Sequence, residues 1–185
     1  MSYTRAFHYT KFIAAGDIVQ SGSILRSKGY HNEIEAVWFS TNPRFDYGSG
    51  MHVRRGQEVR ELSWEMLTTK IGLARFVTDA KLLIPYPEAI AAGLIQPYAV
   101  WYNNKYVGQY SGSTDDWLIH PNADFPLRIC TGAELFLRDQ WVKMTPETIE
   151  EMAALLPRTV GATWSDLFGP GARKRRQPKK RKRKK

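Results

Sequence analysis

Cysteine and long apolar runs are scarce in this chain, and their scarcity excludes several classes of protein. A single cysteine, Cys130, allows no internal disulfide and no zinc site built on cysteines. No stretch approaches the ~18 apolar residues of a membrane-spanning helix, and the first residues lack the apolar segment of a signal peptide. We therefore expect a protein of a reducing compartment, cytoplasmic or, in a eukaryotic cell, nuclear, with no membrane partner.

Several motifs of enzyme sites are also missing. The sequence holds no Gly-x-Gly-x-x-Gly segment, no Walker loop and no nucleophile elbow. Its four histidines, at positions 8, 31, 52 and 120, lack the spacing of metal ligands, and Asp115 and Asp116 near His120 do not complete a set. We therefore expect no bound metal.

Acidic residues are absent from the last thirteen positions, which hold 11 of the 27 basic residues. The other 16 basic residues stand against 18 acidic ones, so the excess charge lies in this segment. It follows the Gly-Pro-Gly sequence at 169–171, and like-charge repulsion predicts that 170–185 is a disordered tail. Nucleic acid is the expected partner, because binding phosphates releases counterions. Nuclear targeting, an anionic membrane surface and a merely solubilising tail are the alternatives. The basic residues expected to bind nucleic acid are Arg173, Lys174, Arg175, Arg176, Lys179, Lys180 and Arg181.

The rest of the chain, 1–169, has the composition of one folded domain. The whole sequence is 43% hydrophobic and 12% aromatic, which favours a packed core. The spacing of apolar residues predicts a helix capped by Thr10 and stopped at Gly22, then many short strands, then a helix that starts at Thr145. This order indicates an α+β fold with helices at both ends of the domain.

The remaining expectations concern particular segments. A short helix is expected within 85–95, after Pro87, and a capping box at 163–166 indicates one more helical turn. Segments 44–61 and 111–126 are expected to be loops. Strands are expected at 6–9, 23–26, 36–41, 71–78, 98–102, 106–110, 127–131, 133–137 and 141–144.

Three short segments carry a pattern that composition alone does not explain. The first, at 7–10, reads FHYT and precedes a helix that ends at Ser21 and Gly22; the second, at 37–42, reads VWFSTN; the third, at 133–136, reads AELF. Together they resemble the His–aromatic–Glu signature of the ADP-ribosyltransferase fold. The opening segment is similar to those of RNA phosphotransferases and DNA-modifying toxins of that fold. The resemblance covers roughly residues 5–144.

The resemblance implies an enzyme that uses NAD. It implies that His8 binds the adenosine ribose, that the backbone of Tyr9 holds the nicotinamide amide, and that Trp38 or Phe39 packs against the nicotinamide ring. It also implies that Ser40 closes the floor of the site. The implied cofactor-binding residues are His8, Tyr9, Thr10, Trp38, Phe39 and Ser40, and the implied catalytic residue is Glu134.

A carboxylate beside the nicotinamide ribose suits the chemistry. Cleavage of the bond to nicotinamide passes through an oxocarbenium-like state, as glycoside hydrolysis does. A fixed anion stabilises that positive charge and can hold the 2′-hydroxyl. Many members carry a second Glu or Gln two residues before the catalytic glutamate. Gly132 stands there in this chain, which weakens the case for an arginine acceptor and leaves a nucleic-acid acceptor open.

Other interpretations of these residues stay open. His8 can be a structural histidine, Trp38 and Phe39 core aromatics, and Glu134 a solvent-facing strand residue. The chain can then be a non-catalytic nucleic-acid-binding module that stacks bases on its aromatics, or an RNA 2′-phosphotransferase that uses NAD. A toxin or defence protein is the setting that the resemblance suggests.

Overall fold

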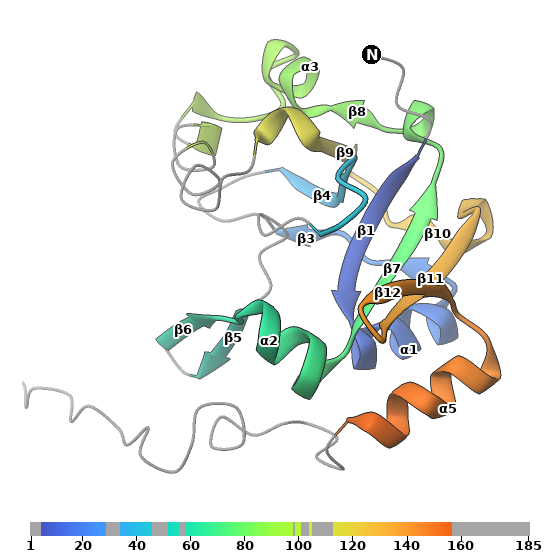
Figure 1. Cartoon of the computed structure of the whole chain (residues 1–185). Helices are drawn as coiled ribbons and strands as arrows, with labels where there is room; N and C mark the ends of the chain where they lie inside the picture. The colour runs from blue at the N-terminus through green and yellow to red at the C-terminus, as the bar shows by residue number, and fades with distance from the viewer. Residues whose placement is uncertain are drawn as a thin grey trace, which may run out of the picture.

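The computed structural model of the chain describes residues 5–28, 34–45, 52–55, 58–97, 99–100, 104 and 113–156. These residues form an α+β fold, in which helices pack on a mainly antiparallel sheet (Figure 1). The basic tail, the expected strand at 106–110 and the capping box at 163–166 lie outside the described residues.

The main sheet joins strands from both ends of the domain. Its order is β12–β11–β7–β1–β4–β9–β8, with the short β3 (Ser27–Lys28) beside β4. Strand β1 lies near the middle, so segments far apart in the sequence become neighbours. The strands are β1 (Ala6–Lys11), β4 (Glu35–Ser40), β7 (Leu73–Thr78), β8 (Ile84–Pro85), β9 (Trp117–Pro121), β11 (Gly132–Leu137) and β12 (Gln140–Lys143).

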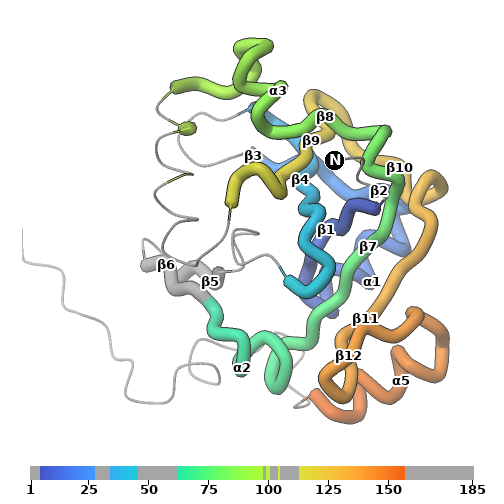
Figure 2. Tube along the Cα trace, turned by 45° about the horizontal axis from the view of Figure 1, so that its top comes forward, coloured from blue at the N-terminus to red at the C-terminus, as the bar shows by residue number. Residues whose placement is uncertain are grey.

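The sheet is weakly joined between β1 and β4. These two strands share a single register pair, Phe7 with Ser40, whereas β1 pairs with β7 along its whole length. The sheet therefore has two halves: the β1 half, with β7, β11 and β12, and the β4 half, with β9 and β8. Figure 2 shows β4, β9 and β8 on one side of β1, and β7, β11 and β12 on the other.

One face of the sheet is covered by two helices. Helix α1 (Phe12–Ser21) contributes Ala15 and Ile18, and α5 (Pro146–Leu155) contributes Met152, to a buried cluster with Phe76 and Leu135 of the sheet. We call this the helical face. The α1 helix ends at Gly22, whose φ of 71° is the left-handed conformation that glycine adopts without strain.

The opposite face carries a different set of side chains in each half. Over the β1 half, Phe7, Tyr9 and Leu73 pack with Leu67 from the π-helical segment Leu67–Ile71, which continues α2 (Trp64–Met66). Over the β4 half, α3 (Tyr86–Ala91) packs its Tyr86 on the strands. We call the first of these surfaces the Tyr9 face.

Several expectations about the strands and helices are confirmed. The aromatic strand expected at 36–41 is β4, the strand at 133–137 is β11, and the final strand is β12. Helix α5 begins as expected: Thr145 caps it in a capping box with Thr148, and Pro146 occupies the first turn.

Other expectations are wrong. Thr10 does not cap α1, because it still pairs with Ala74 in the sheet, and Lys11 takes the cap position. The strand expected at 23–26 is limited to β2 (Ser23–Ile24). The segment 127–131 forms a 3-10 turn at Leu127–Ile129 instead of a strand. The expected strand at 98–102 is helical at Ala99 and Val100.

The two expected loops contain strands. Segment 44–61 holds the hairpin of β5 (His52–Arg55) and β6 (Glu58–Glu61). Segment 111–126 holds β9 and β10 (Phe125–Pro126), and β10 pairs with β2. Strand β9 is buried at Trp117, Leu118 and Ile119. It forms because it pairs with β4, and the spacing of its own residues does not indicate a strand.

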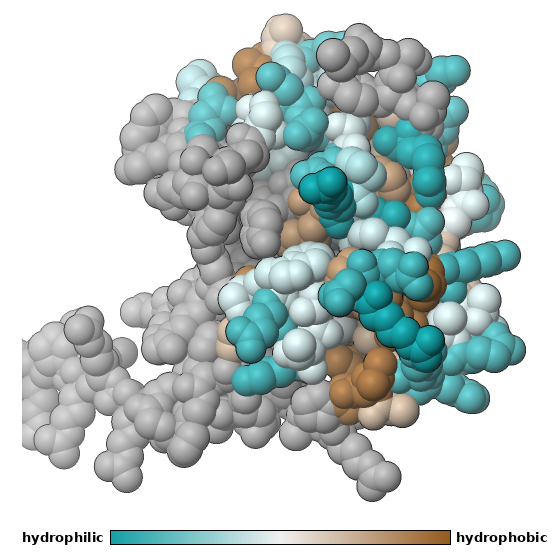
Figure 3. Space-filling model, in the orientation of Figure 1, coloured by the Kyte–Doolittle hydropathy of each residue, from teal (hydrophilic) through white to brown (hydrophobic). Residues whose placement is uncertain are grey.

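On the face shown in Figure 3, apolar residues form small patches between hydrophilic ones. Among the helices that the structure describes, none has the length and apolar character to cross a membrane.

Candidate functional site around Glu134

Pairing across the strands brings Glu134 to the Tyr9 face. In the antiparallel sheet Glu134 of β11 pairs with Arg75 of β7, which pairs with Tyr9 of β1. Directly paired residues point to the same face. On the outer side Glu134 pairs with Lys143 of β12. Four polar side chains thus form one row across the sheet.

Arg75 is the main partner of Glu134. Its Nε donates to Glu134 Oε2 at 2.5 Å, and its Nη2 also lies 2.5 Å from Oε2. The Glu134 side chain is 21% exposed and the Arg75 side chain 7%. Arg5 Nη2 contacts the other oxygen, Oε1, at 3.3 Å, from a side chain that is 54% exposed. The carboxylate therefore has one oxygen held by a buried arginine and one in contact with a mostly exposed arginine.

Aromatic rings enclose the Arg75 guanidinium. Its central carbon lies 4.3 Å from the Phe7 ring centre and 4.2 Å from that of Trp141. Such cation–π contacts favour a guanidinium where water is excluded. The two rings and the carboxylate compensate the charge of a buried arginine.

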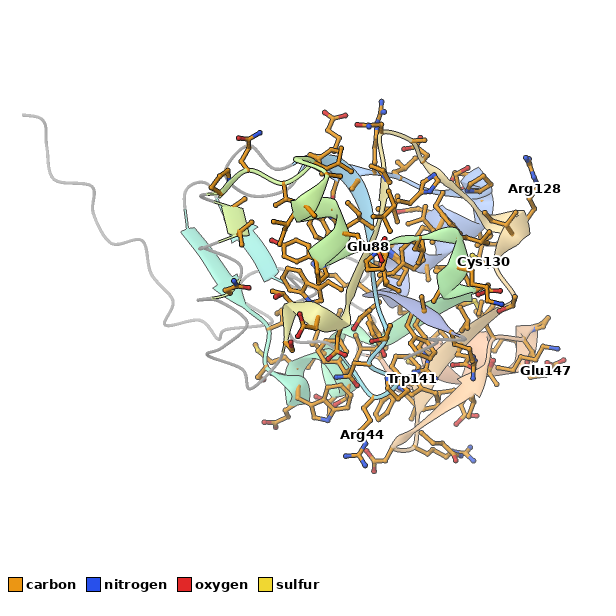
Figure 4. All side chains as sticks on the ribbon, turned by 90° about the horizontal axis from the view of Figure 1, so that it is seen from above. Arg44, Glu88, Arg128, Cys130, Trp141 and Glu147 are labelled. Carbon is orange, nitrogen blue, oxygen red and sulfur yellow. The ribbon has the colours of Figure 1, made fainter. Side chains whose placement is uncertain are left out.

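The loop after β4 is attached to this row through three successive carbonyl groups. Tyr9 Oη donates to the Asn42 carbonyl, Arg75 Nη1 to the Pro43 carbonyl, and Trp141 Nε1 to the Arg44 carbonyl at 2.9 Å. The donors come from β1, β7 and β12. Figure 4 shows Trp141 and Arg44 on the same side of the molecule, with the Arg44 side chain directed outward. The loop is thereby held over the Tyr9 face.

His8 lies on the other side of β1. It pairs with Phe76, which pairs with Ala133, so its row belongs to the helical face. Its Nδ1 lies 2.9 Å from the Trp38 carbonyl, and its ring packs edge-on against Phe39. Burial lowers the pKa of His8, and the hydrogen bond to Trp38 offsets this in part. A neutral ring that donates from Nδ1 leaves Nε2 as an acceptor.

The other expected cofactor-binding residues are dispersed. Trp38 packs with Tyr86 and Trp117 over the β4 half, and Phe39 packs against Phe125 on the helical face. Ser40 is buried, and its Oγ accepts a hydrogen bond from the backbone of Asn42 at 3.1 Å. Thr10 is half-buried beside Ala74. The structure brings Tyr9 and Glu134 into one row, and it places His8 and Phe39 on the opposite face.

Arg75 and Trp141 are site residues that the sequence reasoning missed. Arg75 had a usable signal: an arginine within the apolar strand Leu73–Thr78 implies a buried charge, and a buried charge requires a partner. Nothing local identifies that partner, because Glu134 lies 59 residues further along the chain. Trp141 had no comparable signal.

Comparison with known proteins identifies no family for this chain. No protein-family model, curated protein or solved structure matches the chain. Within the described ranges, no three histidine, cysteine, aspartate or glutamate side chains gather as metal ligands.

Proposed function

We propose that the protein is an NAD-dependent mono-ADP-ribosyltransferase whose acceptor is a nucleic acid or a target bound to one. The observation that supports this most is the partly exposed carboxylate of Glu134, with Oε2 held by buried Arg75 and Oε1 in contact with the mostly exposed Arg5. An immobile anion at a partly exposed position is what an oxocarbenium-like transition state requires.

The proposed reaction is a glycosyl transfer. The bond between C1′ of the ribose and the nicotinamide nitrogen breaks, and nicotinamide leaves with the bonding electrons. Glu134 stabilises the positive charge that develops on the sugar. A nucleophilic atom of the acceptor then forms the new bond to C1′ and loses its proton to solvent. Nicotinamide is a good leaving group, so this step needs no strong general acid.

The roles of the other residues rest on the resemblance. In the proposal His8 binds the adenosine ribose at the junction of β1 and β4, where its Nδ1 lies 2.9 Å from the Trp38 carbonyl oxygen. Tyr9, Thr10, Trp38, Phe39 and Ser40 complete the NAD site. His8 and Glu134 lie on opposite faces of the sheet. A bound NAD therefore has to extend across the junction of β1 and β4 to contact both residues.

Positive charge near Glu134 supports an anionic acceptor. Arg5 contacts the carboxylate, and Lys143, the register partner of Glu134, is exposed. With the basic tail, these groups would hold a phosphate backbone, and the tail would raise the local concentration of the acceptor. We place the protein in the cytoplasm, or in the nucleus of a eukaryotic cell, in a toxin or defence role.

The test is incubation of the full chain with labelled NAD and separate pools of DNA, RNA, RNA with a 2′-phosphate, and protein. We expect label on DNA or RNA and release of nicotinamide. Removal of a 2′-phosphate would indicate the phosphotransferase instead. Nucleic-acid binding with no nicotinamide release and no rise in the unfolding midpoint at millimolar NAD would replace the proposal with the binding module.

Variants connect the activity to Glu134. We expect Glu134→Gln to abolish transfer and Glu88→Gln, at an exposed position on α3, to leave it unchanged. Glu134→Gln also leaves Arg75 buried without an anion, which costs about 3–5 kcal/mol of stability in comparable pairs. The double variant with Arg75→Met removes both charges and is the folded control, checked by circular dichroism. Full transfer in either Glu134 variant would refute the assignment.

A further inference from the structure

The two oxygens of the Glu134 carboxylate have different surroundings. Arg75 directs both Nε and Nη2 to Oε2, each at 2.5 Å, instead of spanning the two oxygens. Oε1 contacts Arg5 at 3.3 Å, longer than the 2.7–2.9 Å usual for a charged N–H to O⁻ bond. Arg5 is also mostly exposed, so solvent screens this contact and its loss costs little.

Each nitrogen of the Arg75 guanidinium has a partner, and two aromatic rings pack against its central carbon. The Phe7 and Trp141 rings lie within 4.3 Å of its central carbon, and Nη1 donates to the Pro43 carbonyl. Nε and Nη2 are engaged by Glu134. The guanidinium can therefore change neither its plane nor its position without breaking one of these contacts.

We propose that Arg75 is the positioning residue of the site: it fixes Glu134 through Oε2, so that Oε1 is the atom that faces the nicotinamide ribose. Arg5 occupies Oε1 until substrate binds and then gives way. This inference rests on the proposed function and assigns each oxygen its own task. A misplacement of about 1 Å at a reacting group can lower a rate on the order of 100-fold, so the effect of Arg75 falls on the chemical step.

Lysine is a poor replacement for Arg75. One ammonium group is a point charge that cannot reproduce the planar set of donors to Glu134 and Pro43, nor stack between two rings. Arg75→Lys therefore keeps the charge and removes the positioning. Arg75→Lys therefore distinguishes an electrostatic role of Arg75 from a geometric one, whereas Arg75→Met removes the charge and the geometry together.

The test compares Arg75→Lys with Arg128→Lys, the same substitution at an exposed arginine of the turn Leu127–Ile129, outside the site. Release of nicotinamide is measured against NAD concentration. We expect Arg75→Lys to lower kcat roughly 100-fold with KM for NAD nearly unchanged, and Arg128→Lys to keep both constants. A wild-type kcat in Arg75→Lys, or an equal loss in Arg128→Lys, would overturn the inference. An inactive wild-type protein would instead refute the proposed function.

A second measurement needs no variant. In the folded protein, the Nε–H signal of Arg75 in nitrogen-15 NMR should be protected from exchange with water. We expect it to stay protected when NAD is added, because Oε2 keeps its partner, while the Arg5 signal changes. A loss of protection at Arg75 on NAD binding would contradict the assignment of Oε2 to Arg75, even if the Arg75→Lys variant does not fold.

Discussion

Substitution of Gly72 by alanine should destabilise the protein through two separate effects. Gly72 precedes β7, the strand that carries Arg75, and its φ of 74° and ψ of 143° lie in a region that residues with a side chain rarely adopt. A Cβ there would also lie 2.9 Å from Phe12 Cβ, 2.9 Å from Leu156 Cδ1 and 3.1 Å from Met152 Sδ. These atoms belong to the start of α1 and to the region of α5.

The magnitude follows from the two effects. The backbone conformation costs about 1–3 kcal/mol, and overpacking typically costs about 1–3 kcal/mol more. We therefore expect Gly72→Ala to lower the free energy of unfolding by about 4 kcal/mol, which lowers Tm by roughly 8–16 °C for a chain of this size.

The matched control is Gly22→Ala at the end of α1. Gly22 has a similar φ of 71°, but no atom lies within 4 Å of the position of its Cβ. This substitution has only the left-handed backbone cost, about 1–2 kcal/mol. Urea denaturation of both variants, followed by circular dichroism, measures the difference. Equal losses for Gly72→Ala and Gly22→Ala would show that Gly72 is not crowded, and would refute the packing described between β7, α1 and α5.

Two further outcomes concern titratable groups. Because burial lowers the pKa of His8, we expect its NMR titration midpoint to lie below the usual value of about 6.5. The unfolded chain then binds a proton that the folded chain does not, so stability should fall as pH drops below about 6.5, and His8→Gln should weaken this dependence. Burial raises the pKa of Cys130 to about 11; we expect its thiol to react with a disulfide reagent at pH 8 on the order of 100-fold more slowly than in the urea-unfolded chain, because reaction requires the thiolate. A fast reaction of the native protein, or a His8 midpoint at or above 6.5, would contradict these expectations.

The sequence predicted the parts of the fold whose signals are local. Helix α5 has its Thr145 cap and a proline in its first turn, Gly22 ends α1, and alternation marked β11 with Glu134. Strand β9 was missed because the apolar run 117–119 is short and becomes a strand only beside β4. The hairpin of β5 and β6 likewise depends on pairing, which residue spacing does not specify.

The sequence predicted individual residues of the candidate site but not how the sheet arranges them. The alternation of β11 placed Glu134 and Phe136 on one face, and the structure agrees, because both belong to the Tyr9 face. The partner of Glu134 could not be predicted, since the register between β7 and β11 decides which residue stands beside it. The register between β1 and β7 puts His8 on the helical face, which the order of the three motifs in the sequence does not reveal.

The attachment of the loop at 42–44 has a mechanical consequence. The junction between β1 and β4 has one register pair, so little of the connection between the two halves of the sheet comes from strand pairing there. The loop continues from β4, yet its three carbonyls are held by side chains of β1, β7 and β12. A movement that separates the two halves therefore displaces Arg75, and through Arg75 it displaces Glu134. The distance between the halves at the β1–β4 junction and the orientation of the Glu134 carboxylate are thus coupled.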